Sequence, residues 1–305
     1  MAGIGHLPYR CGYEFVGPTA RYKSRVSPPF EGFGGRRQAL PSLAAIHFLG
    51  TKSMSDITLT YPRPHIAQIT IDNPAKRNAM SRAMMKDLAG MWDRLEISPV
   101  RAIVLTGAGD KAFCAGADVS GDLSASEEMA RMINRALLKT SSYPKPIIAA
   151  VNGVCAGGGV ELMLSCDIRI AASHAKFGLP EVKWAIYPFG GATAKLVHQI
   201  DFVHAMKLLL TAEMIEAQEA ARIGLINEVV AAEDVLPRAL AIADLIAANS
   251  PVAVQAVKRH VTACSAQAAL DQEAAEQQQG DVVRESADFA EGIAAFREKR
   301  APKYQ

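Results

Sequence analysis

Residues 147–161 read Ile-Ile-Ala-Ala-Val-Asn-Gly-Val-Cys-Ala-Gly-Gly-Gly-Val-Glu and combine a buried strand, three consecutive glycines and the beginning of a helix. The apolar run Ile147–Val151 is typical of a strand covered on both faces. Gly157–Gly159 allow backbone angles and close approaches that side chains forbid. A helix predicted over Val160–Ser165 would turn its free N–H groups and positive dipole end toward the glycines, which suits an anion or a developing oxyanion. The alternative is a strand-to-helix junction that is packed by glycines and holds no ligand.

Similar strands and helices alternate on both sides of this stretch. Alternating apolar and polar residues on both sides of Pro62-Arg63-Pro64 predict a hairpin of strands at Ile57–Tyr61 and His65–Ile71. Short apolar runs predict two further strands, at Ala102–Thr106 and Ile168–Ala172. Apolar residues at helical spacing predict helices at Met80–Leu95, with Ser81 as the N-cap, and at Glu127–Leu138. The alternation of buried strands with helices indicates an α/β fold whose strands are mostly parallel.

The last third of the chain has an almost entirely helical pattern. Helices are predicted at Phe202–Leu210, Glu216–Ile223, Asp234–Ala248, Pro251–Ala263, Ala266–Arg284 and Phe289–Lys299. We therefore expect an α/β core over residues 54–240 and a C-terminal helical region over residues 241–305.

Charge separates the first 53 residues from the rest. The chain of 305 residues has a net charge of +2, but residues 1–53 hold seven basic and two acidic side chains, so the remaining 252 residues carry a net charge of −3. We expect this segment to be a disordered or non-native extension, with Met54 as the natural start and a cytoplasmic location. Its Arg-rich, acid-poor composition is also compatible with a transit peptide and the mitochondrial matrix.

The composition excludes several classes of protein. A near-neutral charge gives no electrostatic basis for a nucleic acid or a membrane as the main partner. The five cysteines are odd in number and contain no CxxC pair, which indicates free thiols. No apolar run reaches the roughly 18–20 residues of a membrane helix. HExxH, clustered Cys/His, P-loop and GxSxG patterns are absent from the sequence, so no metal site is expected.

A second glycine-rich turn, Gly107–Asp118, follows a predicted strand. Its first residues fit the dinucleotide-binding pattern GxGxxA, but no helical periodicity follows Ala112, so that interpretation is disfavoured. The alternative is that the small residues Ala115, Gly116 and Ala117 let a ligand approach the backbone closely.

Two carboxylates accompany the glycine turns. Glu161 falls in the first turn of a predicted helix, where a negative charge is favoured for structural reasons alone. Glu181 follows Phe177-Gly-Leu-Pro in an apolar context, where a surface loop and a partly desolvated acid–base group are the two interpretations. Because an oxyanion turn adjoins one carboxylate and the other follows shortly downstream, we interpret them as an acid–base pair.

Six spaced blocks together resemble the enoyl-CoA hydratase/isomerase family, also called the crotonase family. They are Asn73–Ser81, Ala112–Asp118, Asn152–Glu161, Phe177–Glu181, Ala220–Asn227 and Ala294–Arg300. The likeness runs from about Ile57 to Tyr304. It implies a spiral of repeated ββα units, followed by helices that form a homotrimer or a dimer of trimers.

The resemblance also implies an acyl-CoA thioester as the substrate, with no separate cofactor. The thioester oxygen would accept hydrogen bonds from the backbone N–H groups of Ala117 and Gly158, each worth about 3–4 kcal/mol of transition-state stabilisation. Glu161 and Glu181 would position the water that adds at Cβ and deliver a proton at Cα. Isomerases of the family often retain only the acid at the position of Glu181, so the presence of both favours hydration.

The CoA part of the substrate would be held by a further set of residues. The family's adenine and pantetheine site matches the backbone of Ala115, Gly116 and Asp118, its phosphate-binding positions match Lys76 and Arg77, and its C-terminal contacts, often made to a neighbouring subunit, match Phe296 and Lys299. For the three basic residues, the alternative is a solvated side chain.

One position departs from the family pattern. The segment Ile186-Tyr-Pro-Phe-Gly-Gly-Ala-Thr193 has Phe189 where a glycine that helps to hold the catalytic water is expected. Either Tyr187 and Phe189 reshape the acyl pocket, which would favour a bulky acyl substrate, or the water is held differently.

Three activities compete with hydration as interpretations of the resemblance. Isomerisation of an enoyl-CoA and hydrolysis of an acyl-CoA would use the same fold and the same oxyanion turns. Some relatives bind RNA, but the net charge of −3 after residue 53 disfavours that activity, because RNA binding needs a basic surface.

Overall fold

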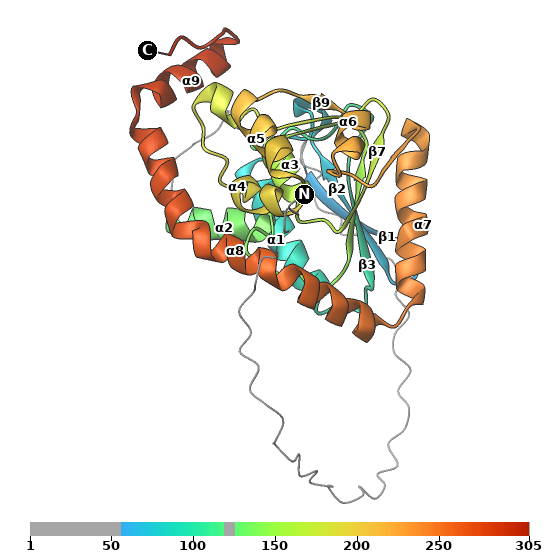
Figure 1. The fold of residues 1–305 in the computed structure, drawn as a ribbon. Helices are drawn as coiled ribbons and strands as arrows, with labels where there is room; N and C mark the ends of the chain where they lie inside the picture. The colour runs from blue at the N-terminus through green and yellow to red at the C-terminus, as the bar shows by residue number, and fades with distance from the viewer. Residues whose placement is uncertain (1–55, 119–125, 305) are drawn as a thin grey trace, which may run out of the picture. The chain divides into compact units, whose positions relative to one another are not determined.

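The structure is a computed structural model that describes residues 56–118 and 126–304 (Figure 1). The predicted extension at residues 1–53 lies outside these ranges. The described residues belong to one compact unit that contains two sheets and nine α-helices among its described segments.

The larger sheet has six strands in the order β1-β2-β3-β5-β7-β10. They are β1 (Asp56–Arg63), β2 (Ile66–Asp72), β3 (Ala102–Gly107), β5 (Ile147–Val151), β7 (Ile168–Ala172) and β10 (Glu228–Val230). Only the β1/β2 hairpin is antiparallel, and every other neighbouring pair in this sheet is parallel. The five predicted strands are confirmed, as are the β1/β2 hairpin and the mostly parallel arrangement.

The second sheet consists of four short strands in the order β4-β6-β8-β9. They are β4 (Ala112–Cys114), β6 (Val154–Ala156), β8 (Lys176–Gly178) and β9 (Ile215–Glu216). Each long strand β3, β5 and β7 is followed by one short strand of this second sheet and then by a helical segment. This repetition confirms the predicted ββα spiral.

Successive turns of the spiral are tied together by an asparagine side chain. The Asn152 amide donates to Gly107 O at 2.9 Å and to Gly109 O at 2.7 Å, which links the end of β5 to the turn after β3. A Cβ atom at Gly153 would overlap the backbone of Lys111, so only glycine lets the two turns stack this closely.

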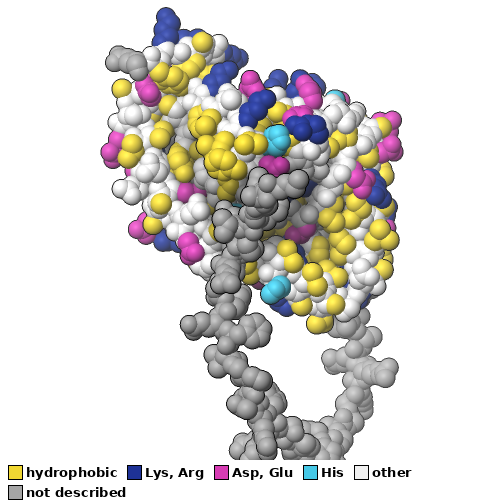
Figure 2. Space-filling view, in the orientation of Figure 1, with side chains coloured by type: hydrophobic (Ala, Val, Ile, Leu, Met, Phe, Trp, Pro, Cys, Tyr) yellow, Lys and Arg dark blue, Asp and Glu magenta, His cyan; other side chains and the backbone are white. Residues whose placement is uncertain are grey.

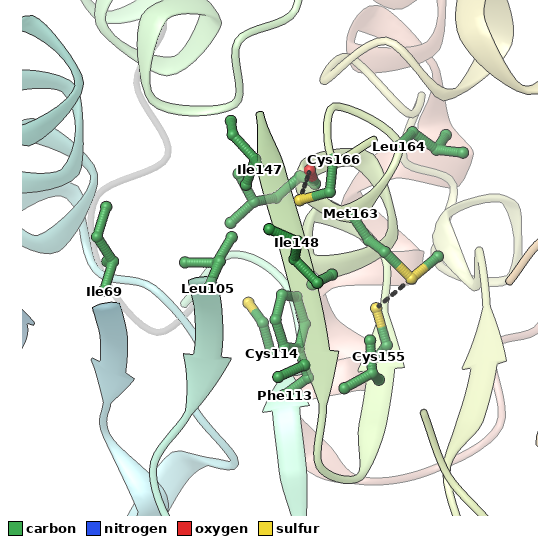
Figure 3. Close-up of a cluster of buried hydrophobic side chains, with 14 of the residues drawn as sticks. Ile69, Leu105, Phe113, Cys114, Ile147, Ile148, Cys155, Met163, Leu164 and Cys166 are labelled. Carbon is green, nitrogen blue, oxygen red and sulfur yellow. Dashed lines mark hydrogen bonds between the residues drawn. The ribbon is translucent and has the colours of Figure 1, made fainter. Parts of the chain in front are cut away.

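The space between the strands and helices is filled by aliphatic, aromatic and sulfur side chains (Figure 3). Leu105, Phe113 and Ile148 are fully buried there beside Cys114 and Cys155. Burial raises the pKa of the Cys114 thiol to about 12, so this group remains uncharged and packs as a small apolar side chain. The four cysteines within the described ranges are free, as predicted.

The α-helices cover the sheets and continue to the C-terminus. They are α1 (Arg82–Glu96), α2 (Glu127–Ala136), α3 (Gly158–Met163), α4 (Ala192–Lys195), α5 (Phe202–Thr211), α6 (Ala217–Arg222), α7 (Val235–Ala248), α8 (Pro251–Glu285) and α9 (Ala287–Glu298). The predicted N-cap of α1 is confirmed, because Ser81 Oγ accepts from Met84 N at 3.2 Å.

The C-terminal region differs from the prediction in one element. Helix α8 is continuous over 35 residues, so the prediction of two helices that break near residue 264 was wrong. Neither glycine nor proline occurs at that point, and nothing there interrupts the backbone hydrogen bonds. The boundary expected at residue 240 falls inside α7, which packs against β3 and β5 of the large sheet.

Several helices leave apolar side chains exposed. Figure 2 shows hydrophobic side chains over α5 and α7, and the exposed residues include Phe202 and Val203 on α5 and Val257 on α8. In the described part of the chain no single helix is long and apolar enough to cross a bilayer; Ala232–Ala248 and Pro251–Glu285 meet the requirements of length and composition only together, as a pair bent by 110°. The trimer implied by the resemblance stays a prediction.

Candidate active site

The three consecutive glycines form the turn between β6 and α3, and two of them are required for different reasons. Gly157 has φ 54° and ψ −127°, angles that only glycine adopts without strain, and its N–H donates to Gly178 O at 3.0 Å. A Cβ atom at Gly159 would overlap Cys114 O of the adjacent strand β4. Between them, Gly158 is the first residue of α3, so its N–H has no acceptor within the helix.

The turn after β4 lies directly against this glycine turn. Met80 N donates to Gly116 O at 2.8 Å and Asp118 N donates to Met80 O at 2.9 Å, so the N–H of Ala117 is directed away from Met80. A Cβ atom at Gly158 would lie 3.6 Å from Ala117 N. Within the described ranges, neither the Ala117 N–H nor the Gly158 N–H has a hydrogen-bond acceptor. The structure thus brings together the two predicted donors.

Strand β4 begins at Ala112, the last residue of the GxGxxA pattern, at the place where a dinucleotide-binding turn would open into a helix.

Glu161 lies one helical turn farther along α3, with its carboxyl group inside the protein. It is 4% exposed, and its Oε1 accepts from Ala192 N at 3.3 Å. A Cβ atom at Gly190 would overlap Glu161 Oε2, so the backbone after η2 lies directly on the carboxyl group. Burial raises the pKa of Glu161 to about 7, although hydrogen bonds from Ala192 and Gly190 and the charge of Lys139 act in the opposite direction.

Glu181 begins the short 3₁₀ helix η2 (Glu181–Trp184), on the other side of the glycine turn. A Cβ atom at Gly157 would lie 2.9 Å from Glu181 Oε1, so the absence of a side chain there makes room for the carboxyl group. Its Oε2 is buried without a hydrogen-bond partner among the described residues. Burial raises the pKa of Glu181 to about 8, and the charge of Glu161 adds to the increase.

These groups have the chemistry of an acid–base site beside an oxyanion site. The two backbone N–H groups can stabilise negative charge on an oxygen, and the two carboxyl groups have pKa values shifted into the neutral range, where one can be protonated while the other is ionised.

The residues predicted to contact CoA lie in two separate places. Lys76 and Arg77 are exposed in the turn before α1, next to the 115–118 backbone: Ala115 N donates to Arg77 O at 3.0 Å, and Lys76 Nζ lies 2.7 Å from Asp118 Oδ2. This arrangement places an exposed basic pair and the small-residue turn on one surface, and it leaves their role in CoA binding a prediction.

The C-terminal pair, Phe296 and Lys299, belongs to a different contact. Phe296 is 42% exposed and packs edge-on against Trp184 of η2, with ring centroids 5.2 Å apart. Lys299 is exposed where α9 ends. The structure therefore places Phe296 beside the element that carries Glu181, and it does not place it with the basic pair before α1.

The Phe189 ring, which we expected to reshape the acyl pocket, lies against helix α8. It packs on Gly280 of α8, where a Cβ atom would overlap the ring, and the Arg284 guanidinium lies 4.7 Å from the ring centroid. The backbone that lies on Glu161 is that of the next residue, Gly190. The departure from the family pattern is therefore accommodated by a glycine on α8.

Phe189→Ala is accordingly expected to act on stability more than on substrate choice. The change removes a half-buried ring from the contact with α8 and should cost about 2 kcal/mol of unfolding free energy. Chemical denaturation would measure the loss, and Tyr187→Ala, which removes the adjoining ring, is the matched control for rates on different thioesters. A changed order of preferred substrates in Phe189→Ala alone would show that the ring lines the acyl pocket.

One further pair of residues lies beside this site, and no sequence pattern points to it. Lys139, after α2, and Glu276, on α8, form an ion pair with Nζ and Oε2 2.6 Å apart, and each side chain is 4% exposed. A lysine and a glutamate in predicted helical or loop segments are ordinarily solvated, so nothing in a single sequence marks them as buried.

Comparisons with known proteins show the family to which the chain belongs. The family model described as enoyl-CoA hydratase/isomerase matches residues 63–305. Enoyl-CoA hydratase EchA19 of Mycobacterium tuberculosis is 41% identical over 80% of this chain and 94% of its own length, and (E)-benzylidenesuccinyl-CoA hydratase of Thauera aromatica is 39% identical over 79% and 96%. The crystal structure of carnitinyl-CoA hydratase from Mycobacterium avium superposes with a TM-score of 0.77, at 36% identity over 84% of this chain and 99% of that one. The chain belongs to the enoyl-CoA hydratase/isomerase (crotonase) family.

Proposed function

We propose that this protein is an enoyl-CoA hydratase, which adds water across the 2,3 double bond of an enoyl-CoA thioester. The observation that carries the proposal is the presence of two buried or partly buried carboxyl groups, Glu161 and Glu181, beside two backbone N–H groups without acceptors in the described chain. The hydratase relatives that match over most of their length support it.

In this proposal the thioester carbonyl oxygen accepts hydrogen bonds from Ala117 N–H and Gly158 N–H. These donors stabilise the enolate oxygen that forms when the oxygen of water bonds to Cβ and the electron pair of the double bond moves toward the carbonyl. Because the donors are fixed by the two glycine turns, they need no reorganisation during the reaction.

The proton steps fall to the glutamates. One ionised carboxylate takes a proton from the attacking water, and one protonated carboxyl group gives a proton to Cα, so the sum of the two steps is the addition of one water. The raised pKa values of about 7 and about 8 make the singly protonated pair an abundant form near neutral pH. Both carboxyl groups are consistent with either role.

A screen of enoyl-CoA thioesters that differ in chain length, branching and aromatic substituents tests the proposal. Hydration removes the ultraviolet absorbance of the conjugated thioester and gives a product heavier by one water. A product of unchanged mass with a shifted double bond would identify an isomerase instead, and release of free CoA would identify a hydrolase. Either of these outcomes, without hydration of any thioester, would overturn the proposed reaction.

A further inference from the structure

The buried ion pair between Lys139 and Glu276 is the strongest unexplained feature near the site. Taking two charges out of water is costly, and apolar side chains of the same size would serve stability at least as well. The pair also joins segments far apart in sequence, since Lys139 follows α2 and Glu276 lies in α8. Such a pair calls for a role besides holding the fold together.

The ion pair is connected to the Glu161 carboxyl group through one short segment, residues 190–193, which contacts both. Thr193 Oγ1 is hydrogen-bonded to Glu276 Oε1, and a Cβ atom at Gly191 would lie 3.1 Å from Lys139 Cγ. The two alternate residues, Gly190 and Ala192, lie on the Glu161 carboxyl group. One side of this segment therefore rests on the ion pair and the other side on Glu161.

Among the described residues, four charged or titratable groups act on Glu161 or are acted on by it. Glu181 of η2 and Glu276 of α8 are acidic, whereas Lys139 and Lys195 of α4 are basic. Lys195 is held by Leu138 O at 2.7 Å and Ser165 Oγ at 2.8 Å, and burial lowers its pKa to about 8. The charge of Lys139 acts to lower the pKa of Glu161 and that of Glu276 acts to raise it, so the two members of the pair act on Glu161 in opposite directions.

We propose that Lys139 and Glu276 are positioning residues for Glu161. The pair holds the 190–193 segment against the Glu161 carboxyl group, and the opposite charges of its two members offset each other there. Helix α8 therefore helps to set the protonation state of Glu161 on α3. This inference rests on the proposed function, in which Glu161 transfers a proton.

The test is a set of charge-neutral variants whose effects on ionisation have opposite signs. Glu276→Gln leaves the positive charge of Lys139 uncompensated and should move one limb of the pH profile of kcat/KM to lower pH by about 0.5–1 unit. Lys139→Gln leaves the negative charge and should move the same limb to higher pH by about the same amount. The double variant should return close to the wild-type midpoint. A purely structural role predicts losses of rate without opposed shifts.

Two further variants separate charge from mechanical support. Glu273→Gln changes a carboxylate one turn earlier on α8, which is hydrogen-bonded to Asn134 and not to the 190–193 segment, and should leave rate and midpoint unchanged. Thr193→Val removes the hydrogen bond to Glu276 without altering charge, and should lower kcat about two- to tenfold while the midpoint stays in place.

A titration that does not depend on turnover keeps this inference separate from the proposed reaction. The carboxylic acid C=O band of Glu161, assigned by its loss in Glu161→Gln, can be followed by infrared spectroscopy against pH. If the titration midpoint of Glu161 moves to lower pH in Glu276→Gln and to higher pH in Lys139→Gln, the pair's role is supported even if no thioester is hydrated. Midpoints that move in the same direction, or not at all, in folded proteins would overturn it; if a single variant does not fold, a double-variant midpoint far from the wild-type value would do the same.

Discussion

Glu161→Gln and Glu181→Gln are each expected to slow the hydration of crotonyl-CoA by about 10²–10⁴-fold, the contribution of a positioned acid or base. Glutamine has nearly the same shape as glutamate, so the contacts of Glu161 with Gly190 and Ala192 and the fit of Glu181 over Gly157 are retained. The amide cannot take up or release a proton at neutral pH. Initial rates at saturating thioester would measure the loss directly.

The same variants should not lose stability, and this distinguishes a catalytic effect from unfolding. Both carboxyl groups have a pKa raised above the ordinary value of 4.5, so the folded state binds these protons more tightly than the unfolded chain. The stabilisation that follows is complete below about pH 4.5 and is lost as the pH rises through the folded values of about 7 and about 8. A glutamine escapes this loss, so Tm of each variant should equal or exceed that of the wild type above pH 8.

A glutamate outside the site, in an ion pair on α6, provides the control. Glu219 pairs with Arg222, and Glu219→Gln should leave turnover unchanged. Turnover close to wild type in Glu161→Gln or Glu181→Gln would contradict the assignment of that residue to proton transfer.

Gly158→Pro is expected to reduce kcat by about 10²–10³-fold, the effect of losing one oxyanion donor. Proline has no N–H, and the first position of a helix is where it is tolerated, because that N–H has no helical acceptor. The preceding residue is Gly157, whose φ of 54° and ψ of −127° are the mirror image of the extended conformation that a residue before proline prefers. The backbone can therefore accept the change.

Gly158→Ala is the matched variant, because it adds a Cβ atom and keeps the N–H. That atom would lie 3.6 Å from Ala117 N, an ordinary contact, so the rate should remain well above that of the proline variant. Circular dichroism and Tm establish that both variants fold. Equal rates in the two variants would show that the Gly158 N–H does not stabilise the reaction.

Strands β3 and β5 were predictable because each is a mainly apolar run of five or six residues that is buried on both faces, and β1 and β2 were predictable because their residues alternate. The short strands β4, β6 and β8 have three residues each, too few to show a period, and they form only because the spiral brings them side by side. The continuity of α8 was not predictable, because its residues alternate between apolar and polar without one continuous stripe.

The candidate site was also only partly predictable from the sequence. The glycine turns and both glutamates stand in short motifs whose residue types are unusual enough to identify them, and the structure brings them together. The direction of the Phe189 ring and the burial of Lys139 with Glu276 depend on where α8 crosses the rest of the chain. That crossing joins residues more than 80 positions apart, and no local pattern records it.

Helix α8 also sets an order of events during synthesis. Glu276 lies 115 residues downstream of Glu161, and ribosomes add about 5–20 residues per second, so roughly ten seconds pass between the two. In the later part of that interval the nascent chain holds both glycine turns and both glutamates, but not yet Glu276, to which Thr193 is hydrogen-bonded. The pocket of Glu161 is therefore completed last during synthesis, by a helix that carries neither glutamate of the proposed acid–base pair.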